Sequence, residues 1–142
     1  MTLTIQIAVD CADPHTLARF WAAAVGYQVE DHHDQITGVL AAGYATDDDT
    51  IEIDGRRAWR TAAACSDPSG GRPRLLFQAV PEPKTVKDRI HLDLHLLEGD
   101  EAREREVARL IALGATRLWD GQQGPQRWVT MADPEGNEFC VS

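Results

Sequence analysis

Apolar and polar residues alternate along residues 4–10 and again along residues 89–95. Alternation of this kind predicts a strand with one buried face and one polar face. Each strand leads into a stretch with apolar residues at helical spacing, and a glycine follows each stretch, Gly26 in the first half and Gly114 in the second. Glycine readily adopts the left-handed conformation that ends many helices. Both halves of the chain are therefore predicted to begin with the same strand–helix pair.

The repeat continues beyond the helices. Residues 67–70 read Asp-Pro-Ser-Gly and residues 133–136 read Asp-Pro-Glu-Gly, and both sequences favour turns. An apolar run follows each turn, at residues 75–78 and at residues 138–141. Each half is therefore predicted to form a β-α-β-β-β module, which places the fold in the α+β class.

The first helix is predicted to start at residues 13–14, because Asp is a preferred cap and Pro fits the first helical position. The second helix is predicted over residues 100–113, with Val107, Leu110 and Ile111 facing inward. Further strands are predicted at residues 27–30, 36–42, 51–53, 59–65, 74–80, 115–119, 127–132 and 137–141, with a hairpin turn at residues 54–55.

The two modules are predicted to make one domain over residues 1–142. Module one covers about residues 1–80 and module two about residues 89–142. The linker between them lies at about residues 81–88, which begin with Pro-Glu-Pro-Lys. In a duplicated fold of this kind, we expect a site between the two copies.

Strand parity decides which side chains can reach such a site, because alternate residues leave opposite faces of a sheet. The apolar face of each first strand is needed to pack against a helix. We therefore expect the following side chains to be buried under the helices: Ile7, Val9, Leu92, Leu94 and Phe139. The polar faces then either meet solvent or, in a curved sheet, line a cleft. In the cleft we expect these side chains: Gln6, Gln78, His91, Asp93 and Cys140.

The composition limits the class of protein. A net charge of −9 argues against binding to DNA or RNA, which requires clustered Lys and Arg. No signal peptide and no apolar run of membrane-spanning length is present. The three cysteines are odd in number and show no CxxC spacing, which is typical of reduced thiols. We therefore expect a cytoplasmic protein without nucleic-acid or membrane partners. The acidic residues 47–49 are expected to form a solvated loop.

Several motifs resemble one known group of proteins. They are the Asp-Pro at residues 13–14, Leu-Gly-Ala at 113–115, Leu-Leu-Phe-Gln at 75–78, His-Leu-Asp-Leu at 91–94 and Gly-Asn-Glu-Phe-Cys-Val at 136–141. Together with the duplicated module they are similar to the vicinal oxygen chelate superfamily, which holds glyoxalase I, bleomycin-resistance proteins and extradiol dioxygenases. The resemblance is closest to small bacterial glyoxalase-like proteins. It implies two β-α-β-β-β modules whose curved mixed sheets surround a central cleft.

The resemblance also implies where a metal would bind. Enzymes of the superfamily hold a divalent ion with His or Gln, Glu, His and Glu, and the matching positions here are Gln6, Gln78, His91 and Cys140. Hard octahedral metals prefer carboxylate oxygens, and this set offers none. We therefore expect no tightly bound cofactor. A zinc, nickel or iron ion held by the same four residues is the alternative.

Without a metal, His91 and Asp93 are the leading candidates for catalysis, because they lie two residues apart on one strand face. The alternative is a hydrogen-bond network with a structural role. Trp59 and Trp128 are candidates to stack on a flat ligand, or else belong to the core. Cys140 is either a ligand contact or a small buried hydrophobe.

Two classes of function follow. The first is a glyoxalase-like enzyme, a lyase or isomerase that acts on a small organic molecule. The second is a metal-free binding protein of the bleomycin-resistance type, which sequesters an aromatic antibiotic or metabolite. The net acidity would suit a cationic guest in this second class. In either class we expect a homodimer, because modules of this type leave open sheet edges.

Overall fold

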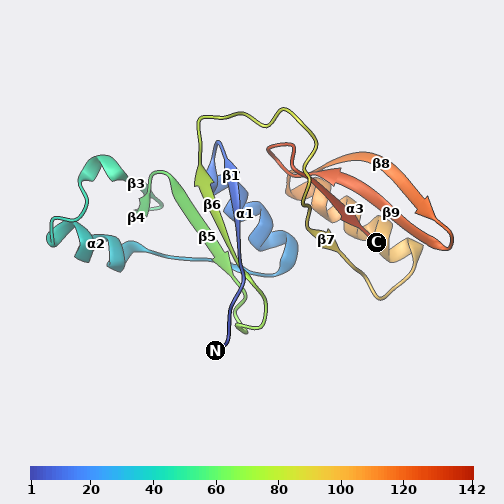
Figure 1. Ribbon diagram of the computed structural model, residues 1–142, viewed down its shortest axis with the longest axis horizontal. Coiled ribbons are helices and arrows are strands. Elements are labelled where there is room, and N and C mark those ends of the chain that lie inside the picture. The colour runs from blue at the N-terminus through green and yellow to red at the C-terminus, as the bar shows by residue number, and fades with distance from the viewer. The chain divides into compact units, whose positions relative to one another are not determined.

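The computed structural model describes residues 1–142 and confirms the α+β class (Figure 1). The chain forms two compact units, Met1–Pro81 and Glu82–Ser142. Each unit consists of a four-stranded mixed sheet with one main helix, and the first unit carries an additional small sheet. Each unit is described below by itself.

The sheet of the first unit has the strand order β1-β6-β5-β2. It contains β1 (Gln6–Cys11), β2 (Gln28–Val29), β5 (Ala62–Ser66) and β6 (Arg74–Ala79). Strand β1 is parallel to β6, and the other two pairs are antiparallel. Helix α1 (Pro14–Val25) packs against β5 and β6, the two central strands.

The sheet of the second unit repeats this arrangement with the order β7-β10-β9-β8. It contains β7 (Asp93–Leu94), β8 (Thr116–Gln123), β9 (Gln126–Ala132) and β10 (Glu138–Val141). Strand β7 is parallel to β10, and the remaining pairs are antiparallel. Helix α3 (Asp100–Leu113) contacts β8 and β10. The predicted duplication is therefore present in the order and direction of the strands.

The two helices begin and end where the local chemistry predicts. The Asp13 carboxylate accepts hydrogen bonds from the backbone N–H groups of His15 and Thr16, which caps α1. Gly26 follows α1 with a φ of 71°, in the left-handed region. Gly114 follows α3 with a φ of 121°, where a side chain would be strained.

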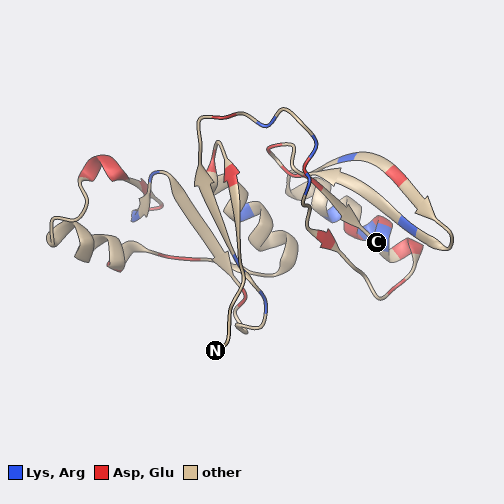
Figure 2. Cartoon of the chain, in the orientation of Figure 1, with Lys and Arg blue, Asp and Glu red and all other residues tan.

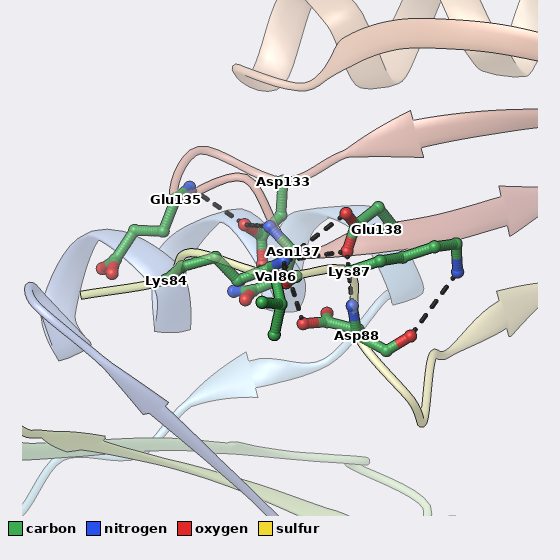
Figure 3. Close-up of polar contacts among 8 residues, drawn as sticks. All are labelled: Lys84, Val86, Lys87, Asp88, Asp133, Glu135, Asn137 and Glu138. Carbon is green, nitrogen blue, oxygen red and sulfur yellow. Dashed lines mark hydrogen bonds and ion pairs between the residues drawn. The ribbon is translucent and has the colours of Figure 1, made fainter. Parts of the chain in front are cut away.

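The repeated turns are also built alike. The backbone N–H of Gly70 donates to the carbonyl of Asp67, and Gly136 donates in the same way to Asp133, both at 2.9 Å. The buried Asp133 carboxylate also accepts from the amides of Glu135 and Asn137, as Figure 3 shows. Each aspartate thus satisfies its own turn, which explains why this motif precedes a strand in both units.

The insertion between β2 and β5 corrects one prediction. A strand is predicted over residues 36–42, but residues 36–41 belong to helix α2 (His33–Ala41) and Ala42 caps its C-terminus. Just before the helix, the Asp31 carboxylate accepts from the backbone N–H of His33, the first residue of α2, at 2.9 Å. Ile36 is fully buried and is the only buried residue of α2. Its contacts outweigh the strand propensity of the Ile, Thr and Val in this segment.

The insertion also contains a small hairpin. Strand β3 (Thr50–Ile53) pairs with β4 (Arg56–Trp59), and the connecting Asp54 and Gly55 both have positive φ, 51° and 75°. The hairpin predicted at residues 54–55 is therefore confirmed. The strand predicted at residues 59–65 is wrong in its first part, because Trp59 ends β4 and pairs with Thr50.

Most charged residues lie on the outside of these elements. Figure 2 shows acidic residues gathered on η1 (Asp47–Asp49) and residues of both signs along α3. Residues 47–49 form a short, exposed 3-10 turn, where a loop was predicted. In α3 the ion pairs are spaced i,i+3, as in Asp100–Arg103 at 3.0 Å, and the exposed Asp100 side chain makes this pair one of modest value.

The strand predicted along residues 89–96 is shorter in the structure. Only Asp93 and Leu94 are assigned to β7, although Leu96 N–H donates to the Ser142 carbonyl at 2.6 Å just beyond it. Strand β7 lies at the edge of its sheet, and its one neighbour, β10, has four residues. In this register His91 and Leu92 lie beside Glu138 and Phe139 but are not paired with them, and only residues 89–90 extend beyond β10.

The expected alternation of burial is present, but its depth differs between strands. Phe139 on the central strand β10 is buried, as predicted. Ile7, Val9, Leu92 and Leu94 face the same way as predicted but are only half-buried, because β1 and β7 are edge strands. One helix residue was placed wrongly. Ile111 is 46% exposed, since α3 buries Val107 and Leu110 instead.

The ion pair between Glu30 and Arg74 gives the first unit a stability that depends on pH. Two arginine nitrogens donate to the two carboxylate oxygens, at 2.7 and 2.9 Å. This contact lowers the pKa of Glu30 below its ordinary value of 4.5 against the opposing effect of burial. A lowered pKa means stability that is present above the unfolded-state pKa and is lost as the pH falls through the folded-state pKa.

Replacing Glu30 with glutamine is therefore expected to reduce the free energy of unfolding at neutral pH by about 1–2 kcal/mol. The difference from wild type should shrink as the pH falls below 4.5, the ordinary carboxyl value. Urea denaturation across this pH range measures both effects. The exposed Glu52, changed to glutamine, is the control, and an equal loss in both variants would contradict the assignment.

Candidate functional site

A pocket of about 610 Å³ lies in the second unit. Side chains of all four strands take part, and the strand registers align Asp93, Cys140, Thr130 and Trp119 in one row across the sheet. Phe139, the residue next to Cys140, is buried with the core. The row therefore lies on the opposite face of the sheet from the one that packs into the core. This is the polar face that parity predicted for the second half.

The most specific contact in the pocket joins His91 and Asp93. His91 Nδ1 donates to Asp93 Oδ1 at 2.6 Å, since an ionised carboxylate only accepts. The same oxygen accepts from the Cys140 backbone N–H at 3.2 Å. Asp93 is thus fixed by strand β10 and in turn fixes the imidazole ring. The proton on Nδ1 leaves the Nε2 lone pair of His91 as a base.

Cys140 lies close to this pair. Its Sγ is 3.6 Å from the Thr130 hydroxyl, and one donor atom each from His91, Asp93 and Cys140 lies within 4.8 Å of the others. Burial raises the pKa of the Cys140 thiol, and the Asp93 charge adds to this effect. Cys140 is therefore a neutral thiol at neutral pH and a poor nucleophile. Sequence parity placed all three residues on one face, but the proximity of Asp93 to Cys140 follows only from the register of β7 with β10.

Glu138, the other acidic residue that lines the pocket, is already bound. Its carboxylate accepts from the Asp88 N–H at 3.0 Å and pairs with the Lys84 ammonium at 3.1 Å (Figure 3). Burial raises the pKa of Glu138, but these two contacts outweigh it and hold the pKa below the ordinary value. Lys84 also donates to the Val86 carbonyl. Glu138 therefore ties residues 84–88 to β10.

Gln6 and Gln78 belong to the first unit and do not converge with each other. Gln6 lies opposite Arg74 and accepts a hydrogen bond from it, whereas Gln78 lies opposite Asp10. Four residues along the strands separate the two positions by about 13 Å. The two positions that the resemblance gives as metal ligands of the first unit are therefore not neighbours in its sheet.

The tryptophans lie in different places. Trp128 lines the pocket of the second unit, together with Trp119. Trp119 was not singled out from the sequence, because an irregularity in β8 between Arg117 and Trp119 sets its face and has no local signal. Trp59 lines a pocket of about 350 Å³ in the first unit, where its carbonyl accepts from His15 Nε2 at 2.7 Å.

The family can be assigned by comparison with known proteins. The sequence profile of the glyoxalase-like domain matches residues 6–142, almost the whole chain. The chain belongs to the glyoxalase-like domain family. The resemblance to the vicinal oxygen chelate superfamily is therefore confirmed. No curated protein sequence matches the chain significantly.

Solved structures agree with the glyoxalase-like fold. A glyoxalase/bleomycin resistance protein/dioxygenase family enzyme from Burkholderia phytofirmans matches with a TM-score of 0.63 and 16% identity, over 96% of this chain and 94% of that chain. Lactoylglutathione lyase from Agrobacterium tumefaciens matches with a TM-score of 0.54 and 12% identity, over 99% and 92%.

A third structure carries a metal. It is a point mutant of the fosfomycin resistance protein FosX from Listeria monocytogenes, complexed with Mn(II) and a dihydroxypropylphosphonic acid. It matches with a TM-score of 0.59 and 11% identity, over 99% of this chain and 89% of that chain. At these identities the likeness extends to the fold and not to the activity. No helix of the glyoxalase-like protein is long and apolar enough to span a membrane.

Proposed function

We propose that this glyoxalase-like protein binds a small aromatic molecule in the pocket of its second unit and transfers a proton on it with His91. The observation that carries this proposal is the 2.6 Å hydrogen bond between His91 and Asp93 at the wall of a pocket that also holds Trp119 and Trp128. An oriented imidazole supplies the base, and the indoles supply flat surfaces for a ring.

The proton transfer uses only residues of the pocket. The Nε2 lone pair of His91 takes an acidic proton from a C–H or O–H group of the ligand, and the electron pair stays on the ligand. The resulting imidazolium is stabilised by the Asp93 carboxylate, which holds the Nδ1 proton without taking it. Return of the proton to a different atom completes an isomerisation. In a lyase reaction the electron pair left by the proton forms a double bond, and the leaving group departs with the electron pair of its own broken bond.

The manganese of FosX raises the question of whether the residues here fit a metal. Mn(II) prefers several oxygen ligands, and the cluster offers one carboxylate beside an imidazole and a thiol. That carboxylate already holds His91, and Glu138 is bound by Lys84. The donor set does not fit Mn(II), so no step is assigned to a metal. Zinc accepts N, O and S ligands, but Asp93, one of the three donors of the cluster, is already hydrogen-bonded to His91 and to the Cys140 backbone.

The purified protein is therefore expected to carry much less than one equivalent of zinc, nickel, iron or manganese per chain. Elemental analysis after purification without chelators measures this content. One tightly held ion per chain, lost in His91→Ala and kept in His95→Ala, would contradict the metal-free site. It would support a metal-dependent glyoxalase-type enzyme instead.

The second candidate function is binding without turnover, which the two indoles of the pocket favour. The net acidity of the chain is a weaker guide to the ligand than the pocket itself, where Lys87 and Arg127 balance Asp93 and Glu138. The charges around this pocket therefore do not favour a cationic ligand.

The homodimer and the cytoplasmic location stay predictions.

Titration with naphthol tests the proposal. Naphthol is a flat two-ring molecule with one acidic O–H, and its absorption spectrum distinguishes the protonated form from the anion in the ground state. We expect saturable binding to wild type, with an absorption change that reports transfer of the O–H proton toward a base. Binding without this change would favour the sequestering function. The absence of saturable binding would contradict both functions for this class of ligand.

A further inference from the structure

The position of Trp128 depends on a glycine on the neighbouring strand. Gly121 of β8 lies directly opposite Trp128 of β9. A Cβ added at Gly121 would lie 2.1 Å from Cε2, 2.3 Å from Nε1 and 2.4 Å from Cζ2 of the Trp128 ring. The indole therefore fills the space that any side chain at position 121 would occupy.

This contact has no equal among the 11 glycines of the chain. A Cβ at Gly114 or at Gly71 would approach its nearest neighbour only to 3.5 and 3.6 Å, and at the other glycines it would meet nothing within 4 Å. Gly121 does not have a positive φ, so its backbone does not require glycine. What requires glycine at this position is the indole of Trp128.

The contact between Gly121 and Trp128 affects the pocket, because both residues lie next to side chains that line it. Trp119 and Gly121 leave the same face of β8, opposite Thr130 and Trp128. With Gly121 the Trp128 ring lies against the backbone of β8 and forms a floor beside Trp119, which is 49% exposed. With any larger residue at position 121 the Trp128 ring must move away from β8, because the backbone of β8 prevents it from moving the other way. The displaced ring would then take up space in the pocket.

We propose that Gly121 is a positioning residue that holds Trp128 flat and so restricts the pocket to flat, aromatic ligands. This inference rests on the proposed function of the pocket in the second unit. Gly121 acts through Trp128 and does not itself touch the ligand. Trp128 supplies the aromatic face on which a ring stacks, and the flat floor leaves height for a ring and not for a puckered saturated molecule.

The experiment compares Gly121→Ala with Gly38→Ala, a change at a glycine whose added Cβ meets nothing within 4 Å. The first readout is the indole N–H resonance of Trp128 in the free protein, which should move in Gly121→Ala only. The second is affinity for naphthol and for its saturated analogue decalol. We expect Gly121→Ala to lose about tenfold in affinity for naphthol, which corresponds to about 1.4 kcal/mol. Discrimination against decalol should fall with it, and Gly38→Ala should match wild type.

A double-mutant cycle separates positioning from a general effect on folding. Trp128→Leu alone should weaken naphthol binding, and adding Gly121→Ala to Trp128→Leu should cost nothing more, because the glycine acts only through the indole. Equal and additive losses would overturn the proposal. It would also be overturned by a Gly121→Ala variant with an unmoved indole resonance, or by one that binds naphthol like wild type.

The cycle also covers a variant that fails to fold. If Gly121→Ala alone is unfolded, the double variant carries the test, since replacing the indole of Trp128 with the smaller leucine side chain removes the clash. A double variant that folds like Trp128→Leu would show that the clash with the indole unfolds Gly121→Ala. A double variant that stays unfolded would overturn the proposal. Wild type that binds no naphthol would refute the proposed function, and with it the ligand role of Gly121. The indole resonance would still show whether the glycine positions the ring.

Discussion

Replacing Phe139 with alanine is expected to destabilise the second unit by about 3–5 kcal/mol. Phe139 is 1% exposed and lies on the central strand β10, so its removal leaves a cavity that the sheet cannot close. A loss of this size is a large part of the stability of a small domain. Urea denaturation followed by circular dichroism measures it.

Tyr44 is the control for this prediction, because it is an aromatic residue with 87% exposure. Its replacement by alanine should change the free energy of unfolding by about 0.5 kcal/mol or less. A similar small change for Phe139→Ala would show that β10 is not packed as described. The alternation that places Cys140 on the pocket face would then also fail, because a register error of one residue exchanges the two faces.

Replacing His91 with alanine is expected to weaken naphthol binding about tenfold or more and to abolish the proton transfer. The fold should survive, because the His91 side chain is 36% exposed and contributes little to the core. Absorption titration and thermal unfolding measure the two effects. Asp93→Asn should keep most of the affinity and lose the proton transfer, since it no longer fixes the tautomer of His91.

His95 provides a matched control in the same pocket. It lies four residues from His91 along the chain, and its Nδ1 is hydrogen-bonded to the Ser142 hydroxyl at 2.7 Å. His95→Ala is therefore expected to change naphthol binding less than His91→Ala. A larger loss in His95→Ala, or unchanged binding in both variants, would move the site away from the His91–Asp93 pair.

The parts of the fold that could be predicted are those with local chemistry. Asp13 caps its own helix, Asp67 and Asp133 close their own turns, and Asp54 and Gly55 make the hairpin by their positive φ. Each of these signals acts within a few residues and needs no tertiary contact. Comparison of the halves then gave the order of the elements along the chain, because both modules repeat the same signals in the same order.

Helix α2 shows where local chemistry is not enough. Its residues include Ile36, Thr37 and Val39, which favour strands, and the burial of Ile36 decides the outcome. Strand β7 is likewise shorter than its alternation predicts, because it lies at the sheet edge and has only one neighbouring strand. Alternation along the sequence indicates neither which single side chain becomes buried nor whether a strand lies at a sheet edge.

The candidate site shows the same division. Parity placed His91, Asp93 and Cys140 on one face, because it depends only on alternation along each strand. The distance between Asp93 and Cys140 and the presence of Trp119 required the registers between strands and the irregularity in β8. The role of Gly121 had no signal in the sequence, since it depends on the Trp128 ring of the neighbouring strand, which only the structure shows.

Chemical-shift mapping with naphthol tests the central claim most directly. In the ¹⁵N-labelled protein, naphthol is expected to move the indole N–H resonances of Trp119 and Trp128 and the backbone amide of Cys140, all in the pocket beside His91. Resonances of the first unit, such as the indole N–H of Trp59, should move less. Shifts confined to the first unit, or no shifts at saturating naphthol, would contradict a ligand site built on the His91–Asp93 pair.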